Sequence, residues 1–240
     1  MTIRLSAPAK LTLGLRVTGV RGDGYHLLDA EMVTLDLEDT LDIDPDGDGL
    51  VVVRGGRSEP GDQDDLVVRA LALAGRRAGV VLHKAVPPGA GLGGGSADAA
   101  AVLRWAGIHD PAVAVGLGAD VAFCVVGGRA RVRGIGEVVE PLAHRDLTLT
   151  LLIPPLHCST PVVYAAWDRL GGPRGDHGND LEPAALSAYP GLARWRDELA
   201  GASGERPRLA GSGSTWFVEG AHPGPGRIVV RTVPARRDGG

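Results

Sequence analysis

The chain has 240 residues, of which 22% are charged and 44% hydrophobic, a composition typical of a folded globular protein rather than a disordered one. Its formal net charge is −4 at pH 7, so it offers no basic surface to nucleic acid. No apolar run approaches the roughly 20 residues that a membrane span requires, and no apolar leader is recognisable, so we expect a cytoplasmic protein with no membrane or nucleic-acid partner.

The first half of the chain combines strand and helix patterns. Residues 3–17 read as two extended pieces joined at Pro8, and residues 31–43 alternate as a strand. Further strands are predicted at 50–53, 80–82, 129–133 and 138–139, and helices at 65–79 and 97–106.

The second half repeats this mixture. Residues 147–153 and 227–233 read as strands, residues 161–169 and 192–200 as helices, and residues 208–218 as two strands joined by a tight loop. A polar segment at 144–147 separates the halves, which predicts two domains, 1–146 and 147–240, of α/β or α+β class. Residues 234–240 are predicted to be a frayed tail. The two cysteines, Cys124 and Cys158, are expected to be buried thiols.

The strongest local signal is the glycine-rich segment 87–96, followed by an alanine-rich helix. Glycines permit positive φ and close approach of the backbone to an anion, and a helix N-terminus attracts negative charge. Ser96 is the predicted N-cap of that helix. Asp98, in its first turn, would repel a bare phosphate and therefore points away or acts through a metal ion. The segment predicts a polyphosphate site.

Two established phosphate-loop patterns fit this segment poorly. No lysine follows the loop, as a Walker A motif requires. Gly89, Gly91 and Gly94 satisfy GxGxxG, with Asp110 where a dinucleotide fingerprint has its acidic residue, but two prolines separate the loop from its strand. An NAD-dependent oxidoreductase is therefore kept only as a weak alternative.

Three other segments belong with the glycine loop. Lys10, one of only two lysines, follows Pro8 in the first strand. Asp120 lies between a glycine turn and an apolar run, and residues 211–215 form a second small, hydroxyl-rich loop. A phosphate cradle, a cation, a carboxylate and a second loop are the parts that phosphoryl transfer needs.

These motifs resemble those of the GHMP kinase superfamily: Pro8-Ala9-Lys10, the loop at 87–96 and the Gly-Ser-Gly-Ser loop at 211–214. Residues 22–26, 118–121 and 179–182 resemble its branch that acts on a cytidylyl-linked polyol. The resemblance spans roughly residues 3 to 220 and implies an α+β fold, with an N-terminal α/β domain and a C-terminal ferredoxin-like domain. It also implies transfer of the ATP γ-phosphoryl group to the 2-hydroxyl of 4-diphosphocytidyl-2-C-methyl-D-erythritol in non-mevalonate isoprenoid biosynthesis.

The resemblance assigns roles residue by residue. Asp120 would take or orient the hydroxyl proton, and Lys10 would be the cation that stabilises its carboxylate. ATP would be held by Lys84, Pro87, Pro88, Gly89, Ala90, Gly91, Leu92, Gly93, Gly94, Gly95, Ser96 and Ala97. Mg²⁺ is expected with ATP, and Ser96 is a candidate ligand for it.

The substrate site implied by the resemblance comprises Thr12, Tyr25, His26, Thr160, Tyr164, Gly211, Ser212 and Gly213. Tyr25 would stack on the cytosine, His26 would hydrogen-bond its edge, and Tyr164 would help to enclose it. Thr12 replaces the usual asparagine and Ala97 a second serine, which leaves substrate affinity open.

Three alternative functions are kept open by the sequence. A GHMP kinase for another small alcohol would not use Tyr25 and His26 to bind a nucleobase. A regulator without catalytic activity would bind ATP but would not phosphorylate any alcohol. The NAD-dependent enzyme would need no Mg²⁺. We expect a monomer or weak homodimer.

Overall fold

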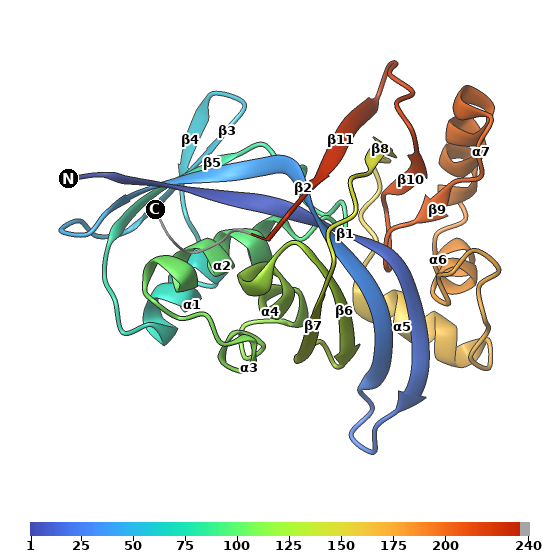
Figure 1. Ribbon diagram of the computed structural model, residues 1–240, viewed down its shortest axis with the longest axis horizontal. Helices are drawn as coiled ribbons and strands as arrows, with labels where there is room; N and C mark the ends of the chain where they lie inside the picture. Colours follow the sequence, from blue (N-terminus) through green and yellow to red (C-terminus); the bar gives the residue numbers. More distant parts are fainter. Residues whose placement is uncertain (236–240) are drawn as a thin grey trace.

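The computed structural model describes residues 1–235, and five residues of the predicted frayed tail lie outside it. The elements follow one another as β1 (Ile3–Val20), β2 (His26–Asp44), β3 (Leu50–Arg54), β4 (Arg57–Pro60), α1 (Leu66–Leu73), β5 (Gly79–Lys84), α2 (Gly94–Trp105), α3 (Pro111–Ala114), α4 (Ala119–Val126), β6 (Arg129–Gly134), β7 (Val138–Leu142), β8 (Thr148–Leu152), α5 (Thr160–Arg169), α6 (Glu182–Ala188), α7 (Leu192–Ser203), β9 (Arg208–Leu209), β10 (Trp216–Glu219) and β11 (Arg227–Val233) (Figure 1). The mixed strand and helix content predicted from the sequence is confirmed.

The long β1–β2 hairpin organises the molecule. In Figure 1 it runs between α1 to α4 on one side and α5 to α7 on the other. β2 pairs with β1, β5, β6 and β11, all antiparallel, while β3 and β5 are a parallel pair. The register of β1 against β2 shifts between Pro8 and Lys10, where the sequence predicted a joint. Proline has no N–H to donate to a sheet, and such irregularities re-aim neighbouring side chains.

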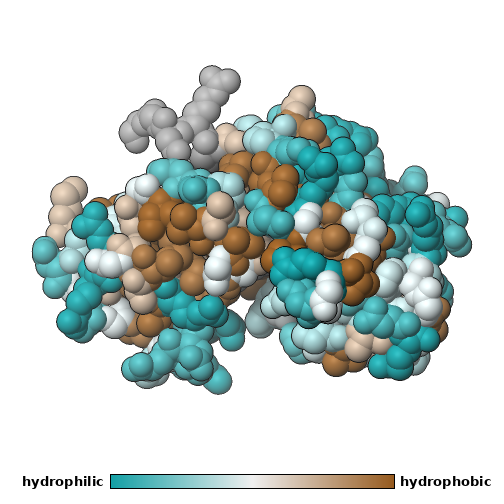
Figure 2. Space-filling view, turned by 90° about the horizontal axis from the view of Figure 1, so that it is seen from below, coloured by the Kyte–Doolittle hydropathy of each residue, from teal (hydrophilic) through white to brown (hydrophobic). Residues whose placement is uncertain are grey.

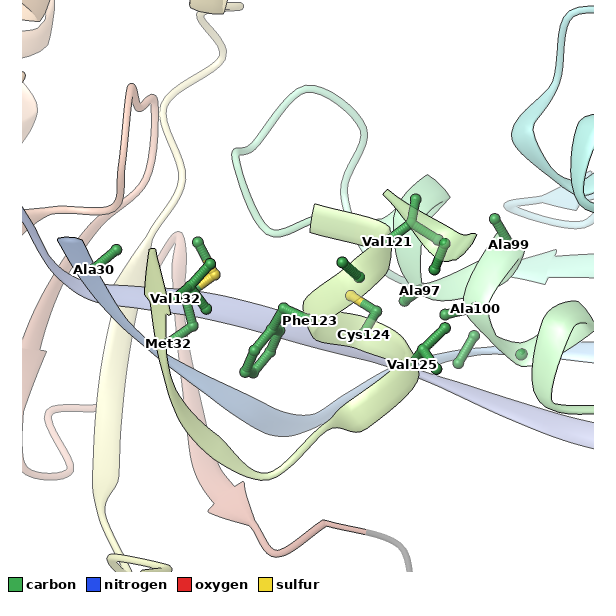
Figure 3. Packing of buried hydrophobic residues seen from close by; sticks show 14 of the residues in the cluster. Ala30, Met32, Ala97, Ala99, Ala100, Val121, Phe123, Cys124, Val125 and Val132 are labelled. Carbon is green, nitrogen blue, oxygen red and sulfur yellow. The ribbon is translucent and has the colours of Figure 1, made fainter. Parts of the chain in front are cut away.

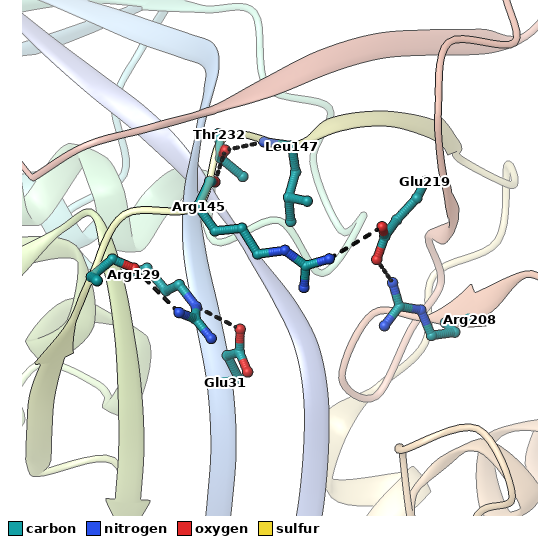
Figure 4. A network of polar contacts seen from close by, with 8 residues as sticks. Glu31, Arg129, Arg145, Leu147, Arg208, Glu219 and Thr232 are labelled. Carbon is teal, nitrogen blue, oxygen red and sulfur yellow. Dashed lines mark hydrogen bonds and ion pairs between the residues drawn. The ribbon is translucent and has the colours of Figure 1, made fainter.

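The last strand ties the two halves of the chain together. β11 pairs with β8 along 227–231, and then Thr232 and Val233 pair with β2. Thr232 also accepts a hydrogen bond from the Leu147 N–H at 2.9 Å and donates one to the Arg145 carbonyl at 2.7 Å (Figure 4). The predicted boundary at 144–147 is thus fastened to a strand from the C-terminal end, and the division into two domains stays a prediction.

Ion pairs flank this junction. The Arg129 guanidinium donates to Glu31 at 2.8 Å on the β2–β6 side. On the β10 side, Glu219 lies 3.5 Å from Arg145 and 3.1 Å from Arg208, as Figure 4 shows. Because these side chains are partly exposed, each pair contributes little by itself to stability.

The hydrophobic core under β1 and β2 is formed by α2 and α4. Alanines of α2 are buried on several faces of the helix, which lets it approach its neighbours closely. Figure 3 shows Cys124 and Val125 beside these alanines, while Phe123 lies toward Met32 and Val132. Seen from below, hydrophobic residues gather near the middle of the molecular face and hydrophilic ones toward its ends (Figure 2). No helix within residues 1–235 has the length and apolar character to cross a membrane.

Both cysteines are free and buried, as expected. Burial raises the pKa of the Cys124 thiol to about 12, and it raises the pKa of Cys158 as well. A buried thiol held in its protonated form is unreactive.

The structure corrects several element boundaries. The helix predicted at 65–79 ends at Leu73, because Gly75 adopts φ +60°. The second helix begins at Gly94 instead of 97, so Ser96 is not its N-cap; Gly93 holds that position with φ +66°. The sequence reading also missed β4 and the short helices α3, α4 and α6. These segments are short, and their apolar runs match neither periodicity well.

Candidate active site

Three cavities lie side by side along the glycine-rich segment. The largest, about 700 Å³, is called here the acceptor cavity and is lined by Lys10, Thr12, Tyr25, His26, Asp120, Tyr164 and neighbours. The loop cavity, about 390 Å³, is lined by Lys84, Asp98 and all of residues 87–95. The junction cavity, about 310 Å³, shares Lys10, Ser96 and Asp120 with the first and glycines 89, 91 and 93–95 with the second. One continuous path therefore leads from the glycine loop to the acceptor cavity.

The glycine loop delivers unpaired backbone donors to this path. The Ala97 N–H already bonds to the Gly93 carbonyl at 2.8 Å, which leaves the N–H groups of residues 94–96 as the free donors of the α2 N-terminus. Ser96, which borders the junction cavity, belongs to this set. A helix N-terminus with free N–H groups is a binding site for phosphate oxygens. Ala97, in contrast, is buried in the core and lines none of the three cavities.

Two glycines are required by close contacts as well as by their backbone angles. A Cβ on Gly91 would lie 2.4 Å from the Gly213 carbonyl oxygen, and one on Gly93 would lie 2.8 Å from Cγ of Lys10. Both glycines have φ near +70°. The loop can therefore lie flat against the second loop and against Lys10 only because these side chains are missing.

The second loop, residues 211–215, is fastened to the first. The Thr215 hydroxyl donates to the Ala90 carbonyl at 2.6 Å. The buried Asn179 amide donates to the carbonyls of Leu209 and Gly211, at 2.9 and 2.7 Å. The motif at 179–182, singled out in the sequence, therefore supports the second loop through Asn179. Ser212 is held at the cavity by Thr160, whose hydroxyl lies 2.9 Å away.

Lys10 and Asp120 meet where the junction and acceptor cavities join. Lys10 Nζ lies 3.2 Å from the Asp120 carboxylate and donates to the Thr12 hydroxyl at 3.4 Å. The Lys10 side chain is 7% exposed, whereas that of Asp120, in the first turn of α4, is 35% exposed. At the register shift of β1, the Lys10 backbone N–H bonds to the Leu92 carbonyl at 2.9 Å. A sequestered cation thus holds a carboxylate that a bound molecule can reach.

Lys84 is engaged by two buried carboxylates. Its Nζ lies 2.5 Å from Asp39 and 2.6 Å from Asp98, and Asp39 also accepts the N–H groups of residues 85 and 86. Burial raises the pKa of Asp98 to about 7, which the charge of Lys84 only partly offsets. For Lys84, burial acts to lower the pKa, but the two carboxylates outweigh it and raise the pKa overall. Asp98 borders the loop cavity, but its partner is Lys84, and through Lys84 and Asp39 it anchors α2 to β5 and β2.

The far end of the acceptor cavity is aromatic. The His26 ring stacks on Tyr164 with centroids 4.5 Å apart, meets Trp167 edge-on at 5.5 Å, and places Nε2 2.8 Å from an Asp168 oxygen. Burial, and then the nearby Asp120, raise the pKa of the Tyr164 hydroxyl, which stays neutral. Tyr25 borders the same cavity and is 59% exposed, with the Arg21 guanidinium over its ring at 5.4 Å. A flat apolar ring would find aromatic faces at this end of the cavity.

Sequence reasoning missed three residues that border these cavities or support them. Asp39 has the same parity along β2 as Leu35, Leu41 and Ile43, so the alternating pattern already placed a carboxylate on the apolar face of that strand. Asp168 follows Tyr164 by one helical turn, but nothing local connects it to His26. His157 lines the junction cavity beside Gly89, and no motif marks it.

The weak oxidoreductase reading gains no support from Asp110. Its carboxylate accepts the Ala112 N–H at 2.8 Å and caps α3, and it borders none of the three cavities. An acidic residue used in this way is an N-cap, not a ribose ligand.

No protein-family model matches the chain. It is 41% identical over 236 residues to 4-diphosphocytidyl-2-C-methyl-D-erythritol kinase of Paracoccus denitrificans, covering 89% of this chain and 85% of that protein. It is 35% identical to the enzyme of the same name from Thiobacillus denitrificans, covering 100% and 94%. A crystal structure of 4-(cytidine 5'-diphospho)-2C-methyl-D-erythritol kinase superimposes with a TM-score of 0.77 at 32% identity, covering 96% of this chain and 99% of the other. Mevalonate kinase of Methanococcus jannaschii shares the fold alone, with a TM-score of 0.59 at 10% identity, covering 97% and 99%.

Proposed function

Because the chain belongs to the family of 4-diphosphocytidyl-2-C-methyl-D-erythritol kinases, we propose that it transfers the γ-phosphoryl group of ATP to the 2-hydroxyl of that cytidylyl polyol. It is a kinase with an alcohol group as acceptor, of the GHMP type in fold. The observation that carries the residue assignment is the Lys10–Asp120 pair, which lies where the cavity beside the glycine loop opens into the larger one.

ATP enters the loop cavity in this proposal. Its phosphates lie against residues 87–96 and receive the free N–H groups at the start of α2, while the apolar side chains of Val52, Leu82 and Val86 border the same cavity. Lys84 borders this cavity as well, and its charge is already paired with Asp39 and Asp98. Its contribution is to keep the strand before the loop and the helix after it in place.

Asp120 acts on the acceptor hydroxyl. As that oxygen forms its bond to the γ-phosphorus, its proton passes to the Asp120 carboxylate, and the bond from the γ-phosphorus to the bridging oxygen breaks to release ADP. Lys10, 3.2 Å from Asp120, stabilises the negative charge that develops on the transferred group. Phosphoryl transfer needs little more than this positioning and charge stabilisation.

Mg²⁺ fits this site as a partner of the nucleotide rather than as a resident metal. Within residues 1–235, no three His, Cys, Asp or Glu side chains are grouped so as to hold a metal ion. Mg²⁺ characteristically keeps phosphate oxygens and waters among its ligands and uses few protein groups. The Ser96 hydroxyl, which borders the junction cavity, is the group that would hold it, and the ion would neutralise phosphate charge.

The aromatic end of the acceptor cavity takes the cytosine. Tyr25 offers an exposed ring face, Tyr164 a buried one, and His26 a ring nitrogen for the base edge. Thr160, Ser212 and the backbone of residues 211–213 lie between this end and the junction cavity, where they border the polyol and diphosphate. Thr12 is buried against Lys10, at the end of the acceptor cavity where the hydroxyl reacts. It offers a hydroxyl there in place of the amide of the usual asparagine.

The test is release of ADP from Mg·ATP in the presence of 4-diphosphocytidyl-2-C-methyl-D-erythritol, with mevalonate and homoserine as competing alcohols. Turnover with the cytidylyl polyol alone is expected. In the same assay Asp120→Asn is expected to lose turnover, and Asp197→Asn, which neutralises an exposed carboxylate on α7, is the matched control and is expected to retain full activity. Turnover with another alcohol and not with the cytidylyl polyol would overturn the substrate assignment and leave the kinase assignment in place.

A further inference from the structure

The His26 ring is held on three sides by residues of one helix. Tyr164 stacks on it, Trp167 meets it edge-on, and Asp168 lies 2.8 Å from Nε2, all three from α5. Only 11% of the His26 side chain is exposed, although it borders the acceptor cavity. His26 itself comes from the start of β2, so the tertiary structure alone brings the ring and the carboxylate together.

The contact with Asp168 determines which ring nitrogen of His26 carries the proton. An ionised carboxylate has no proton to donate, so at 2.8 Å it accepts one from Nε2, and Nε2 therefore carries an N–H. Between the two neutral tautomers of the imidazole, this contact selects the Nε2–H form. Nδ1 is then left with a lone pair. Among residues 1–235, none forms a hydrogen bond with Nδ1, so it is available as an acceptor.

An acceptor at this place distinguishes two pyrimidines of the same shape. Cytosine carries an N4 amino group, a donor, where uracil carries the O4 carbonyl, an acceptor. The Nδ1 lone pair accepts a hydrogen bond from the N4 amino group of cytosine. Against uracil it faces the O4 carbonyl, so two acceptors meet and neither receives a proton. If the proton moved to Nδ1, the preference would reverse.

We propose that Asp168 is a positioning residue that holds His26 in the Nε2–H tautomer and thereby selects a cytidylyl over a uridylyl substrate. The inference rests on the proposed function, in which the edge of the base faces His26. Asp168 also borders the acceptor cavity, with its side chain 52% exposed, and its Oδ1 is the atom that holds Nε2.

The first experiment compares the cytidylyl polyol with its uridylyl counterpart in wild type, Asp168→Asn and Asp168→Glu. The wild type is expected to prefer the cytidylyl substrate by roughly 10- to 100-fold in kcat/KM, the effect of one satisfied against one clashing hydrogen bond. In Asp168→Asn the amide can donate or accept, so the preference falls toward unity, mainly through KM for the polyol, with KM for ATP unchanged. Asp168→Glu restores part of the preference, since it keeps the carboxylate.

The second experiment needs no substrate. Long-range ¹H–¹⁵N spectra of the imidazole groups distinguish an Nε2–H from an Nδ1–H tautomer, and His26→Gln identifies the His26 signals. The wild type is expected to show His26 as the Nε2–H form, and Asp168→Asn a mixture of the two. An unchanged tautomer or an unchanged base preference in Asp168→Asn would overturn the inference, while wild-type turnover would leave the proposed function standing. If the wild type fails to turn over the cytidylyl polyol, the proposed function fails and the base selection with it.

Discussion

Replacing Asp98 by asparagine is expected to change how the stability of the protein depends on pH. The Asp98 side chain is buried, and its Oδ1 has no hydrogen-bond partner among residues 1–235. Burial raises its pKa to about 7 from an ordinary value of 3.8. The folded protein therefore holds a proton that the unfolded chain releases, so the stability from this group is fully present below about pH 4 and is lost as the pH rises through about 7.

The size of the effect follows from the pKa difference. About three pH units at about 1.4 kcal/mol each give about 4 kcal/mol in total, of which about 3 kcal/mol falls between about pH 5 and about pH 8. An asparagine at position 98 has no proton to lose and can still accept from Lys84. Wild type is thus expected to lose about 3 kcal/mol more than Asp98→Asn across this range.

Urea unfolding followed by tryptophan fluorescence, with Trp216 fully buried, measures both profiles. Asp48→Asn serves as the control, because the hydrogen bond from Arg77 lowers the pKa of that exposed carboxyl and it titrates below the range measured. Histidines contribute equally to all three proteins and cancel in the difference. Parallel profiles for wild type and Asp98→Asn would refute the reasoning, because they would mean that Lys84 keeps Asp98 ionised throughout.

Three further predictions concern the reaction and the loops. Asp120→Asn is expected to lower kcat by roughly 10²- to 10⁴-fold while the Kd for ATP, measured by calorimetry, stays unchanged; unchanged turnover would remove Asp120 from the mechanism. Tyr25→Ala is expected to raise KM for the cytidylyl polyol by roughly 10- to 100-fold through loss of stacking, and an equal rise in KM for ATP would contradict the cytosine assignment. Gly91→Ala is expected to cost roughly 1–3 kcal/mol more stability than Gly107→Ala, since both have positive φ but only the Cβ at 91 meets a backbone atom, the Gly213 oxygen. Equal unfolding midpoints for these two glycine variants would show that the loops yield to one another.

Part of this fold could be predicted because its causes are local. The alternation along β2, the apolar run of β8 and the helical spacing of α5 and α7 appear within single segments and were placed within a few residues. The predicted helix at 97–106 began three residues too late, because a glycine in left-handed conformation replaced the expected serine cap. Short helices such as α4 were missed, since eight residues of apolar sequence suit a buried strand equally well.

The sequence by itself determined the chemistry that depends on residue type: a glycine loop able to approach an anion, one cation at Lys10 and one carboxylate at Asp120. It could not determine that Lys84 is paired with Asp39 and Asp98, or that Asp168 holds His26, 142 positions away along the chain. Nor could it show that β11 would return to β2 and join the two halves. Each of these depends on strand register and helix placement, which are set by packing between distant segments, and only the tertiary structure brings such segments together.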